Sequence, residues 1–366
     1  MKLCFYNLTA GFKTGGLETY CWEVGRALVN QGHEVHIIGG MGGQPRNQEV
    51  QLIALPYTPR ERFPNFGTRF RKLAERLSFA RHARPLLLRG GYDAIIVNKP
   101  YDFPALRWLR QHGFTGVTAL RSGGTDFYWG DRYFARAVDV WLSTSAYNAR
   151  QVETRYHRQV SLIPNGVDPD TFAPRAKNLA LRQQLGIPGD AQVVISVGRL
   201  VGWKGLHTLI QTLPELPHLH YLAVGKGEAR TQLEALAQQL GVASRVHFAG
   251  EVAHNQLPEY FNAADCFAQP SIGEEAFGIS VAEAMSCGLP VLASDQGGLR
   301  EVVAPSRTGL LLPPGASAAW VEALGELLDP KRRQAMGEAA RQRVLAHYTW
   351  AGNASKLLAH LQQAQG

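Results

Sequence analysis

The chain has 366 residues, of which 45% are hydrophobic and 19% are charged. This length allows two domains of ordinary size, and the balance of apolar and charged residues excludes an intrinsically disordered protein. The first residues, MKLCFYNL, turn polar almost at once, and no apolar run approaches the ~20 residues of a membrane-spanning helix. We therefore expect a folded protein with neither a signal peptide nor a transmembrane helix.

The cysteines and histidines do not form a metal-binding or disulfide pattern. The four cysteines are scattered beside apolar residues and form no C-x-x-C pair, and the 12 histidines show no H-E-x-x-H spacing. This usage favours reduced, buried thiols, as is typical of cytoplasmic proteins. We expect a cytoplasmic protein without a bound metal.

The net charge of +8 is unevenly distributed. Residues 1–168 contain 22 basic and 13 acidic residues, whereas the remainder contains 16 and 17. The basic character therefore belongs to the first half, which suggests that this half meets an anionic partner. Nucleic acid is disfavoured because no recognised reader motif accompanies the basic residues.

The chain opens with a strand at Lys2–Asn7, a glycine-rich turn at 9–16 and a helix from about Leu17 to Gln31. Such a turn lets backbone amides approach a phosphate, although glycine could equally serve the turn alone. The spacing does not match G-x-G-x-x-G, which argues against a nicotinamide dehydrogenase. The apolar strands that follow, separated by helical segments, predict a parallel sheet with helices on both faces, whose ligands bind at the carboxyl ends of the strands. These strands are predicted at 32–38, 50–55, 94–97, 117–120, 138–144 and 160–163.

Residues 60–89 break this rhythm because they contain nine basic residues and only two acidic ones. Apolar residues at three- and four-residue spacing give a helix with one apolar stripe flanked by guanidinium groups. Such a helix can lie on an anionic bilayer, or its stripe can pack on the sheet with the arginines solvated. The basic residues that we predict to contact a membrane are Arg69, Arg71, Lys72 and Arg76.

Polar residues follow the strand that ends at Leu120. Arg121 and Asp126 are the polar candidates there to contact a bound ligand, although Asp126 could instead cap the next helix. Further on, Pro164-Asn165-Gly166 marks a turn, and 169–174 reads as a linker. We place the domain boundary at residue 168.

The second half restarts the alternation of strands and helices, with strands at 193–197, 219–224, 246–249 and 265–269. Arg199 and Lys204 follow the first of these strands and precede a helix. Arginine can bind phosphate oxygens in bidentate fashion and lysine supplies a point charge, so this pair suits a diphosphate.

The most informative stretch is 271–294, SIGEEAFGISVAEAMSCGLPVLAS. Glu275 precedes a predicted helix, and Glu283 lies about two turns into it. Carboxylates so far apart cannot share one proton, but they can hold two groups of one elongated ligand. Gly288-Leu289-Pro290 then ends the helix before a short buried strand.

This stretch resembles the E-x7-E signature of retaining glycosyltransferase family 4, a GT-B family of nucleotide-sugar-dependent enzymes. Two glutamates eight residues apart could also be solvated side chains on a surface helix. The specific features are the surrounding residues: Phe277-Gly278, Glu283-Ala284-Met285, Gly288-Leu289-Pro290-Val291 and Gly297-Gly298 follow the family's order. The G-R-x4-K-G string of Arg199 and Lys204 and the Gly15-Gly16 pair also match the family.

The resemblance implies a GT-B fold, with two Rossmann-like domains, at 1–168 and 169–349, facing across a cleft. A terminal helix at 350–366 is implied to pack back on the first domain. By resemblance, Arg199, Lys204 and Glu275 are the catalytic residues, with Glu283 on the ribose. The implied donor-binding residues are Gly15, Gly16, Val252, Phe277, Gly278, Ile279 and Glu283. Family members often carry a histidine near Arg121, and this chain has none there, which leaves Arg121 and Asp126 as the polar candidates to touch the donor or the acceptor.

We therefore expect a cytoplasmic, metal-independent retaining glycosyltransferase that needs no cofactor beyond its sugar-nucleotide substrate. The expected donor is a UDP-sugar. The expected acceptor is a glycan or glycolipid of cell-surface polysaccharide or lipopolysaccharide synthesis, with peripheral contact to an anionic membrane. A sugar-nucleotide 2-epimerase on the same fold and a non-catalytic sugar-nucleotide-binding partner protein stay open as alternatives.

Overall fold

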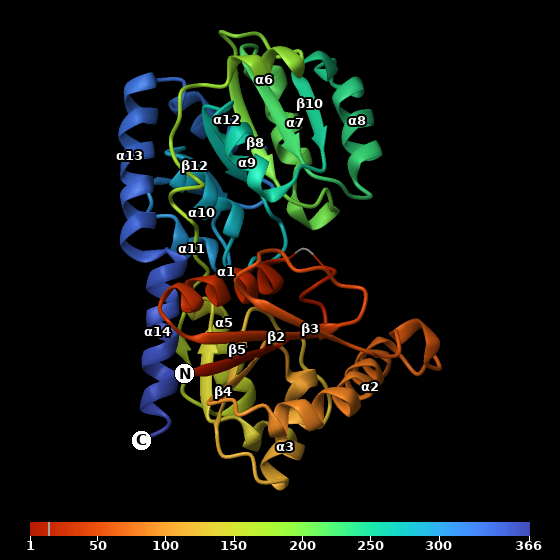
Figure 1. The fold of residues 1–366 in the computed structure, drawn as a ribbon. Coiled ribbons are helices and arrows are strands. Elements are labelled where there is room, and N and C mark those ends of the chain that lie inside the picture. The colour runs from red at the N-terminus through yellow and green to blue at the C-terminus, as the bar shows by residue number, and fades with distance from the viewer. Residues whose placement is uncertain (14) are drawn as a thin grey trace. The chain divides into compact units, whose positions relative to one another are not determined.

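The computed structural model describes residues 1–13 and 15–366, so Thr14 of the glycine-rich turn lies outside it. The chain divides into two compact units (Figure 1). The first unit comprises Met1–Gly166 and Trp350–Gly366, and the second comprises Val167–Thr349. This division lies two residues before the boundary placed at residue 168.

The described part of the first unit contains a seven-stranded, wholly parallel sheet in the order β3-β2-β1-β4-β5-β6-β7. Alternate residues of β1 face opposite cores, as the period of a strand requires. Leu3 and Phe5 pack with one set of helices, and Cys4 and Tyr6 pack with the other. The strands are β1 (Lys2–Tyr6), β2 (Glu34–Gly40), β3 (Gln51–Leu55), β4 (Ala94–Val97), β5 (Val117–Ser122), β6 (Val140–Ser143) and β7 (Ser161–Leu162).

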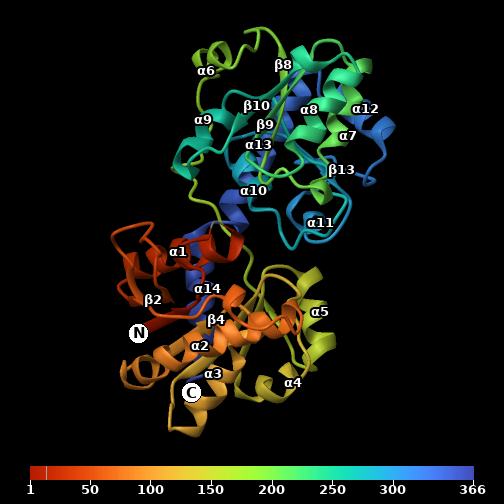
Figure 2. The ribbon, with the colours of Figure 1, turned by 90° about the vertical axis from the view of Figure 1, so that its right-hand side faces the viewer.

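Helices cover both faces of this sheet. The longer helices of the unit are α1 (Gly16–Asn30), α2 (Thr68–Arg89), α3 (Phe103–Gln111), α5 (Ala146–Tyr156) and α14 (Trp350–Gln363), with a single turn at α4 (Asp131–Phe134). α14 packs against α1, and Trp350, Leu357 and Leu361 join the core formed by Tyr20 and Trp22. The opposite face carries α2 and α3, and Figure 2 shows them on one side of the unit with α4.

The described second unit is built on a six-stranded parallel sheet in the order β10-β9-β8-β11-β12-β13. Its strands are β8 (Gln192–Val197), β9 (Leu219–Val224), β10 (Val246–Gly250), β11 (Cys266–Gln269), β12 (Val291–Ser294) and β13 (Gly309–Leu312). Its helices are α6 (Leu179–Gln184), α7 (His207–Thr212), α8 (Arg230–Gln239), α9 (Leu257–Phe261), α10 (Ile279–Ser286), α11 (Leu299–Val302), α12 (Ser317–Glu326) and α13 (Pro330–His347). The expected α/β class with two parallel sheets is thus confirmed.

None of the helices in the described chain is both long and apolar enough to cross a bilayer. The four cysteines are buried and unpaired in disulfides. Burial raises the pKa of the Cys21 thiol to about 12, which makes it unreactive at neutral pH.

Two histidines form a half-buried pair on neighbouring strands of the second sheet. His247, on β10, lies with Nδ1 3.0 Å from the Leu185 carbonyl oxygen and with Nε2 3.0 Å from Nδ1 of His220, on β9. Burial lowers the pKa of both imidazoles, and the neighbouring His247, Arg245 and Arg182 lower that of His220 further, against an opposing effect of Asp190. The folded protein therefore favours the neutral pair.

This pair predicts a pH-dependent stability. Because both pKa values are lower in the folded than in the unfolded chain, their stabilisation is complete above the unfolded value of about 6.5 and is lost as the pH falls below it. We expect the melting temperature to fall between about pH 7.5 and about pH 5.5, and to fall less in a His220→Gln/His247→Gln variant. Equal slopes for the two proteins in calorimetric scans would contradict this assignment.

Candidate functional site

The loops at the carboxyl ends of β8 and β11 bring opposite charges together in the second unit. Lys204 follows β8, Glu275 follows β11, and Nζ of Lys204 lies 2.5 Å from Oε1 of Glu275. Both side chains are largely buried, with 15% and 12% of their surfaces exposed. The predicted cation and carboxylate, 71 residues apart, therefore share one site.

Two further side chains hold the same carboxylate oxygen. Gln269, the last residue of β11, donates from Nε2 to Oε1 of Glu275 at 3.0 Å, and the Ser271 hydroxyl donates to it at 2.9 Å. Both residues are buried. In the described chain, all the hydrogen bonds to the Glu275 carboxylate meet on Oε1. Oε2 is left as an acceptor for a ligand.

The backbones of these loops are interlocked. The amides of Ile272 and Gly273 donate to the Trp203 carbonyl oxygen at 2.9 and 3.0 Å. Gln296 donates from its side-chain amide to the carbonyl oxygens of Ser271 and Gly273. A Cβ on Gly205 would lie 2.1 Å from the Pro270 carbonyl oxygen, so only glycine permits this close approach.

Arg199 lies on the same loop as Lys204 and is exposed. Its guanidinium carbon is 5.9 Å from the centre of the Trp203 ring, and Nζ of Lys204 is 4.9 Å from it. The indole thus has both predicted cations beside it, within the reach of cation–π attraction. We call Arg199, Trp203, Lys204, Gln269, Ser271 and Glu275 the cation–carboxylate cluster.

The turn that leads into α10 requires glycine. Gly278 has φ of +93°, where other residues are strained. A Cβ on Gly298 would lie 2.2 Å from the Ala276 carbonyl oxygen, and the Gly298 amide donates to the carbonyl oxygen of Glu275 at 2.7 Å. Phe277 is buried against Tyr348, and Ile279 begins α10. The predicted residues of this turn are therefore adjacent to Glu275.

Glu283 lies in the middle of α10 and is buried. His254, which follows β10 and comes two residues after Val252, lies with Nε2 2.6 Å from Oε1 of Glu283. The loop that carries Val252 thus reaches the second carboxylate of the E-x7-E pair.

In the first unit, Gly15 and Gly16 lie at the start of α1. Gly15 is the N-cap, where its extended backbone is followed directly by the first helical turn. A Cβ there would lie 2.7 Å from Oε2 of Glu18, which is itself buried and accepts from the Thr9 hydroxyl at 2.5 Å. A larger residue at 15 would therefore displace the Glu18 carboxylate.

Arg121 is fully buried, and this argues against its predicted contact with donor or acceptor. Nη2 donates to Oδ1 of Asn165 at 2.6 Å and to the Ile163 carbonyl oxygen at 3.2 Å. The guanidinium lies 3.8 Å from the centre of the Tyr20 ring. Burial lowers its pKa to about 10, so it is still a cation at neutral pH. Arg121 therefore fastens the segment just before the unit boundary.

Asp126 does not cap a helix, because Gly130 is the residue that precedes α4. It pairs instead with Lys72 of α2 at 2.9 Å and with Lys99 at 3.2 Å. Burial would raise the pKa of Asp126, but the bond to Lys72 and the charge of Lys99 outweigh it and lower the pKa. Asp126 thus ties the loop after β5 to α2.

The residues of α2 that were predicted to contact a membrane differ in their exposure and partners. Arg69 is exposed, whereas Arg76 is buried and bonds Asp102 at 3.2 Å, so Arg76 does not reach the surface. Lys72 is engaged by Asp126, and Nε of Arg71 donates to the Phe63 carbonyl oxygen at 3.1 Å. The predicted apolar stripe stays partly exposed, since Phe66, Phe70 and Leu77 are 75%, 42% and 40% exposed.

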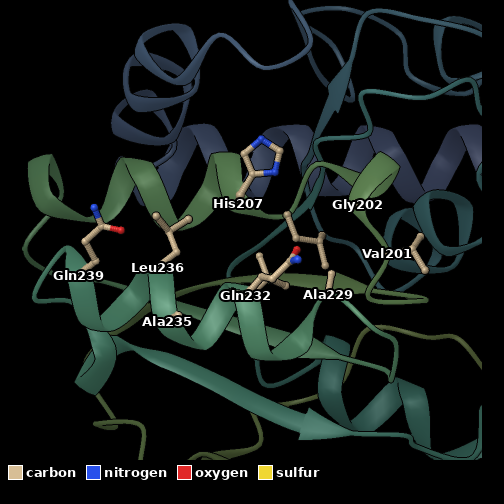
Figure 3. A pocket seen from close by; sticks show the side chains of 10 residues that line it. Val201, Gly202, His207, Ala229, Gln232, Ala235, Leu236 and Gln239 are labelled. Atoms are coloured by element: carbon tan, nitrogen blue, oxygen red, sulfur yellow. The ribbon is translucent and has the colours of Figure 1, made fainter.

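A groove of about 440 Å³ lies between α7 and α8 (Figure 3). Leu206, Leu233 and Leu236 give it an apolar floor, and Val201 and Gly202 of the Arg199–Lys204 loop border it. The carboxylates Glu275 and Glu283 are not among its lining residues. The groove therefore adjoins the cation-bearing loop.

Sequence reasoning missed Trp203, Gln269, Ser271, His254 and Gln296. Trp203 lies inside the G-R-x4-K-G string, and Gln269 ends a predicted strand, where ligand-binding residues of parallel sheets occur. Local sequence patterns could therefore have identified Trp203 and Gln269. They could not have identified His254, because nothing in its local sequence connects it with Glu283.

Two family models match the chain. The model described as "Glycosyltransferase Family 4" matches residues 14–171, and the model described as "Glycosyl transferases group 1" matches residues 178–343. Together they span most of the chain.

Similar proteins and structures agree with these models. The D-inositol 3-phosphate glycosyltransferase of Xylanimonas cellulosilytica is 29% identical over 96% of this chain and 92% of its own. The GDP-mannose-dependent alpha-(1-6)-phosphatidylinositol monomannoside mannosyltransferase of Mycobacterium tuberculosis is 29% identical over 94% of both chains. The structure of sucrose-phosphate synthase from Thermosynechococcus elongatus superposes with a TM-score of 0.83 at 25% identity, covering 99% of this chain and 98% of the other. The chain belongs to glycosyltransferase family 4, has the GT-B fold and is a glycosyltransferase.

Proposed function

We propose that this enzyme transfers a hexose-type unit from a nucleoside diphosphate sugar to a glycan or glycolipid acceptor, with retention of configuration and without a metal ion. The observation that carries the proposal is the cation–carboxylate cluster, in which Lys204 and Glu275 meet at 2.5 Å with Arg199 beside the same indole. A diphosphate beside an uncharged sugar needs this combination of cations and hydrogen-bond acceptors.

The residues have separate roles in this reaction. The bond between the anomeric carbon and the phosphate oxygen breaks, and Arg199 and Lys204 stabilise the negative charge that develops on the diphosphate. The acceptor oxygen bonds the same carbon, and its proton passes to the departing oxygen on the same face of the sugar. Glu275 presents Oε2 to the sugar hydroxyls, with the amides at Phe277 and Gly278, and Glu283 accepts from the ribose.

The proposal also covers the nucleobase of the donor and the identity of the acceptor. We expect UDP-sugar as the donor, although one relative's name specifies GDP-mannose. The relatives named above act on inositol phosphate or phosphatidylinositol mannoside according to their names, which accords with an anionic or lipid-linked acceptor. For this chain we propose an acceptor in cell-surface polysaccharide or lipopolysaccharide synthesis.

A thermal-shift panel of UDP-, GDP- and ADP-sugars tests the donor. A ligand that binds only the folded state raises the melting temperature by mass action, so the true donor should give the largest shift. No shift with any of them would contradict a sugar-nucleotide site. Incubating the best donor without an acceptor separates transfer from epimerisation, because an epimerase would convert the sugar nucleotide alone.

The role of Lys204 gives a second prediction. Lys204→Ala should lower kcat about 100-fold, because a well-placed charge in the transition state is worth ~3 kcal/mol, whereas donor affinity should change far less. The matched control is Lys226→Ala, which removes an exposed lysine paired with Glu251 on the loop after β9. Equal losses of affinity and turnover in Lys204→Ala would contradict the catalytic role.

We further propose peripheral contact with an anionic membrane through α2. The exposed side chains on and beside this helix combine the aromatic Phe66 and Phe70 with Leu77, Arg69 and Arg81. Nearby, α3 packs between α2 and α4. Trp129, just before α4, is 95% exposed, and Tyr133 of α4 is 53% exposed. Amphipathic aromatic rings and arginines favour the lipid headgroup region. Figure 2 shows these helices on one side of the first unit.

Vesicle sedimentation tests this contact. Phe66→Ser/Phe70→Ser and Arg69→Gln/Arg81→Gln should each weaken binding to vesicles containing anionic lipid, and only the aromatic variant should weaken the binding that persists at high salt. The control is Lys331→Gln/Arg307→Gln, which removes two exposed basic charges from the second unit. Unchanged sedimentation of both α2 variants would remove the hypothesis.

A further inference from the structure

Glu283 is a buried carboxylate on an otherwise apolar stretch of helix. Its neighbours Val281, Ala282, Ala284 and Met285 all belong to the core between α10 and the sheet. Burying a carboxylate is costly unless it accepts hydrogen bonds. In the described chain, the donor to its Oε1 is Nε2 of His254 at 2.6 Å, and no described group donates to its Oε2.

The imidazole also contacts an aromatic ring. Phe172 is buried, and its ring centre lies 5.2 Å from that of His254. The backbone of Phe172 is itself fixed, because its carbonyl oxygen accepts from the Ser286 hydroxyl at 2.6 Å and from Nη1 of Arg341 at 3.1 Å. Packing against Phe172 therefore restricts the movement of the His254 imidazole, although the side chain is half exposed.

We infer that His254 is a positioning residue for the nucleoside of the donor, acting through Glu283. By engaging Oε1, it holds the carboxylate turned so that Oε2 is presented as the acceptor for a ribose hydroxyl. This inference rests on the proposed role of Glu283 at the ribose. It adds a residue on a different strand loop that controls how strongly the site distinguishes ribose from deoxyribose.

The physical reason is the cost of leaving a buried charge without its partner. Without His254, Oε1 would lose a charge-assisted hydrogen bond, and the carboxylate would be free to rotate away from its bonded orientation. A rotated Glu283 would no longer serve as a fixed acceptor. The loss should therefore fall on the recognition of ribose hydroxyls, and less on the chemical step, which takes place at the cation–carboxylate cluster.

The test is calorimetric titration with UDP and GDP, followed by the 2′-deoxy and 3′-deoxy forms of whichever binds tighter. Wild type should lose affinity when the recognised hydroxyl is removed. His254→Ala should bind the ribonucleotide about tenfold more weakly and should lose most of that discrimination, since the loss of one charge-assisted hydrogen bond is of this order. In kinetic assays, its KM should rise more than its kcat falls.

Conservative and control variants separate positioning from a general structural effect. His254→Gln keeps an N–H donor and should retain the ribose discrimination, with affinity within about threefold of wild type. His218→Ala, at an exposed histidine of the same unit, should behave as wild type. If His254→Ala discriminates between ribose and deoxyribose as well as wild type does, the inference is wrong and the proposed function stands. If wild type binds neither nucleotide, the proposed function fails, and this inference fails with it.

Discussion

The site of the second unit depends on the ion pair between Lys204 and Glu275. Largely buried charges of opposite sign are costly to separate, because each would face a poorly solvating interior alone. The chain therefore holds their loops together by other means: backbone bonds from Ile272 and Gly273 to Trp203, the amide of Gln296, and a close approach that only Gly205 allows. This bracing places a cation and a carboxylate at the ends of two strands that are adjacent in the sheet.

The two carboxylates of the E-x7-E pair follow the same principle in different surroundings. In each, the protein occupies one oxygen: three donors meet on Oε1 of Glu275, and His254 meets Oε1 of Glu283. A carboxylate with one oxygen engaged is held in a fixed orientation, while its second oxygen is available to a hydroxyl. Glu275, in a loop, has a lysine as its partner, and Glu283, in a helix, has an imidazole. This difference matches their proposed tasks near a diphosphate and near a neutral ribose.

In the first unit, an excess of basic residues does not translate directly into a basic surface. Arg76 and Arg121 are buried, and Lys72 and Lys99 neutralise Asp126. The Arg121 guanidinium in particular lies inside the fold, where it donates to Asn165 and lies over the ring of Tyr20. What the surface of α2 presents is therefore a mixture of aromatic rings with a few arginines. A contact made by such a surface would depend on apolar insertion as well as on charge, and so would be less sensitive to salt than the sequence alone suggests.

The parts of this structure that local sequence determines could be predicted, and those that depend on convergence in space could not. The strands at 94–97 and 219–224 were predicted with their observed bounds, because short apolar runs between turns allow few alternatives. The site loops were predictable because glycines and charges stand there at fixed spacing.

His254, in contrast, acts on a residue 29 positions away. For His254, the path between the two residues passes through α9 and β11 before the chain reaches Glu283 in α10. The order of strands in the sheet does not make these loops neighbours either, since β10 and β11 are separated by β8 and β9. The His254 side chain, which packs against Phe172, spans the distance from the loop after β10 to Glu283. Local sequence patterns therefore could not predict that His254 bonds Glu283.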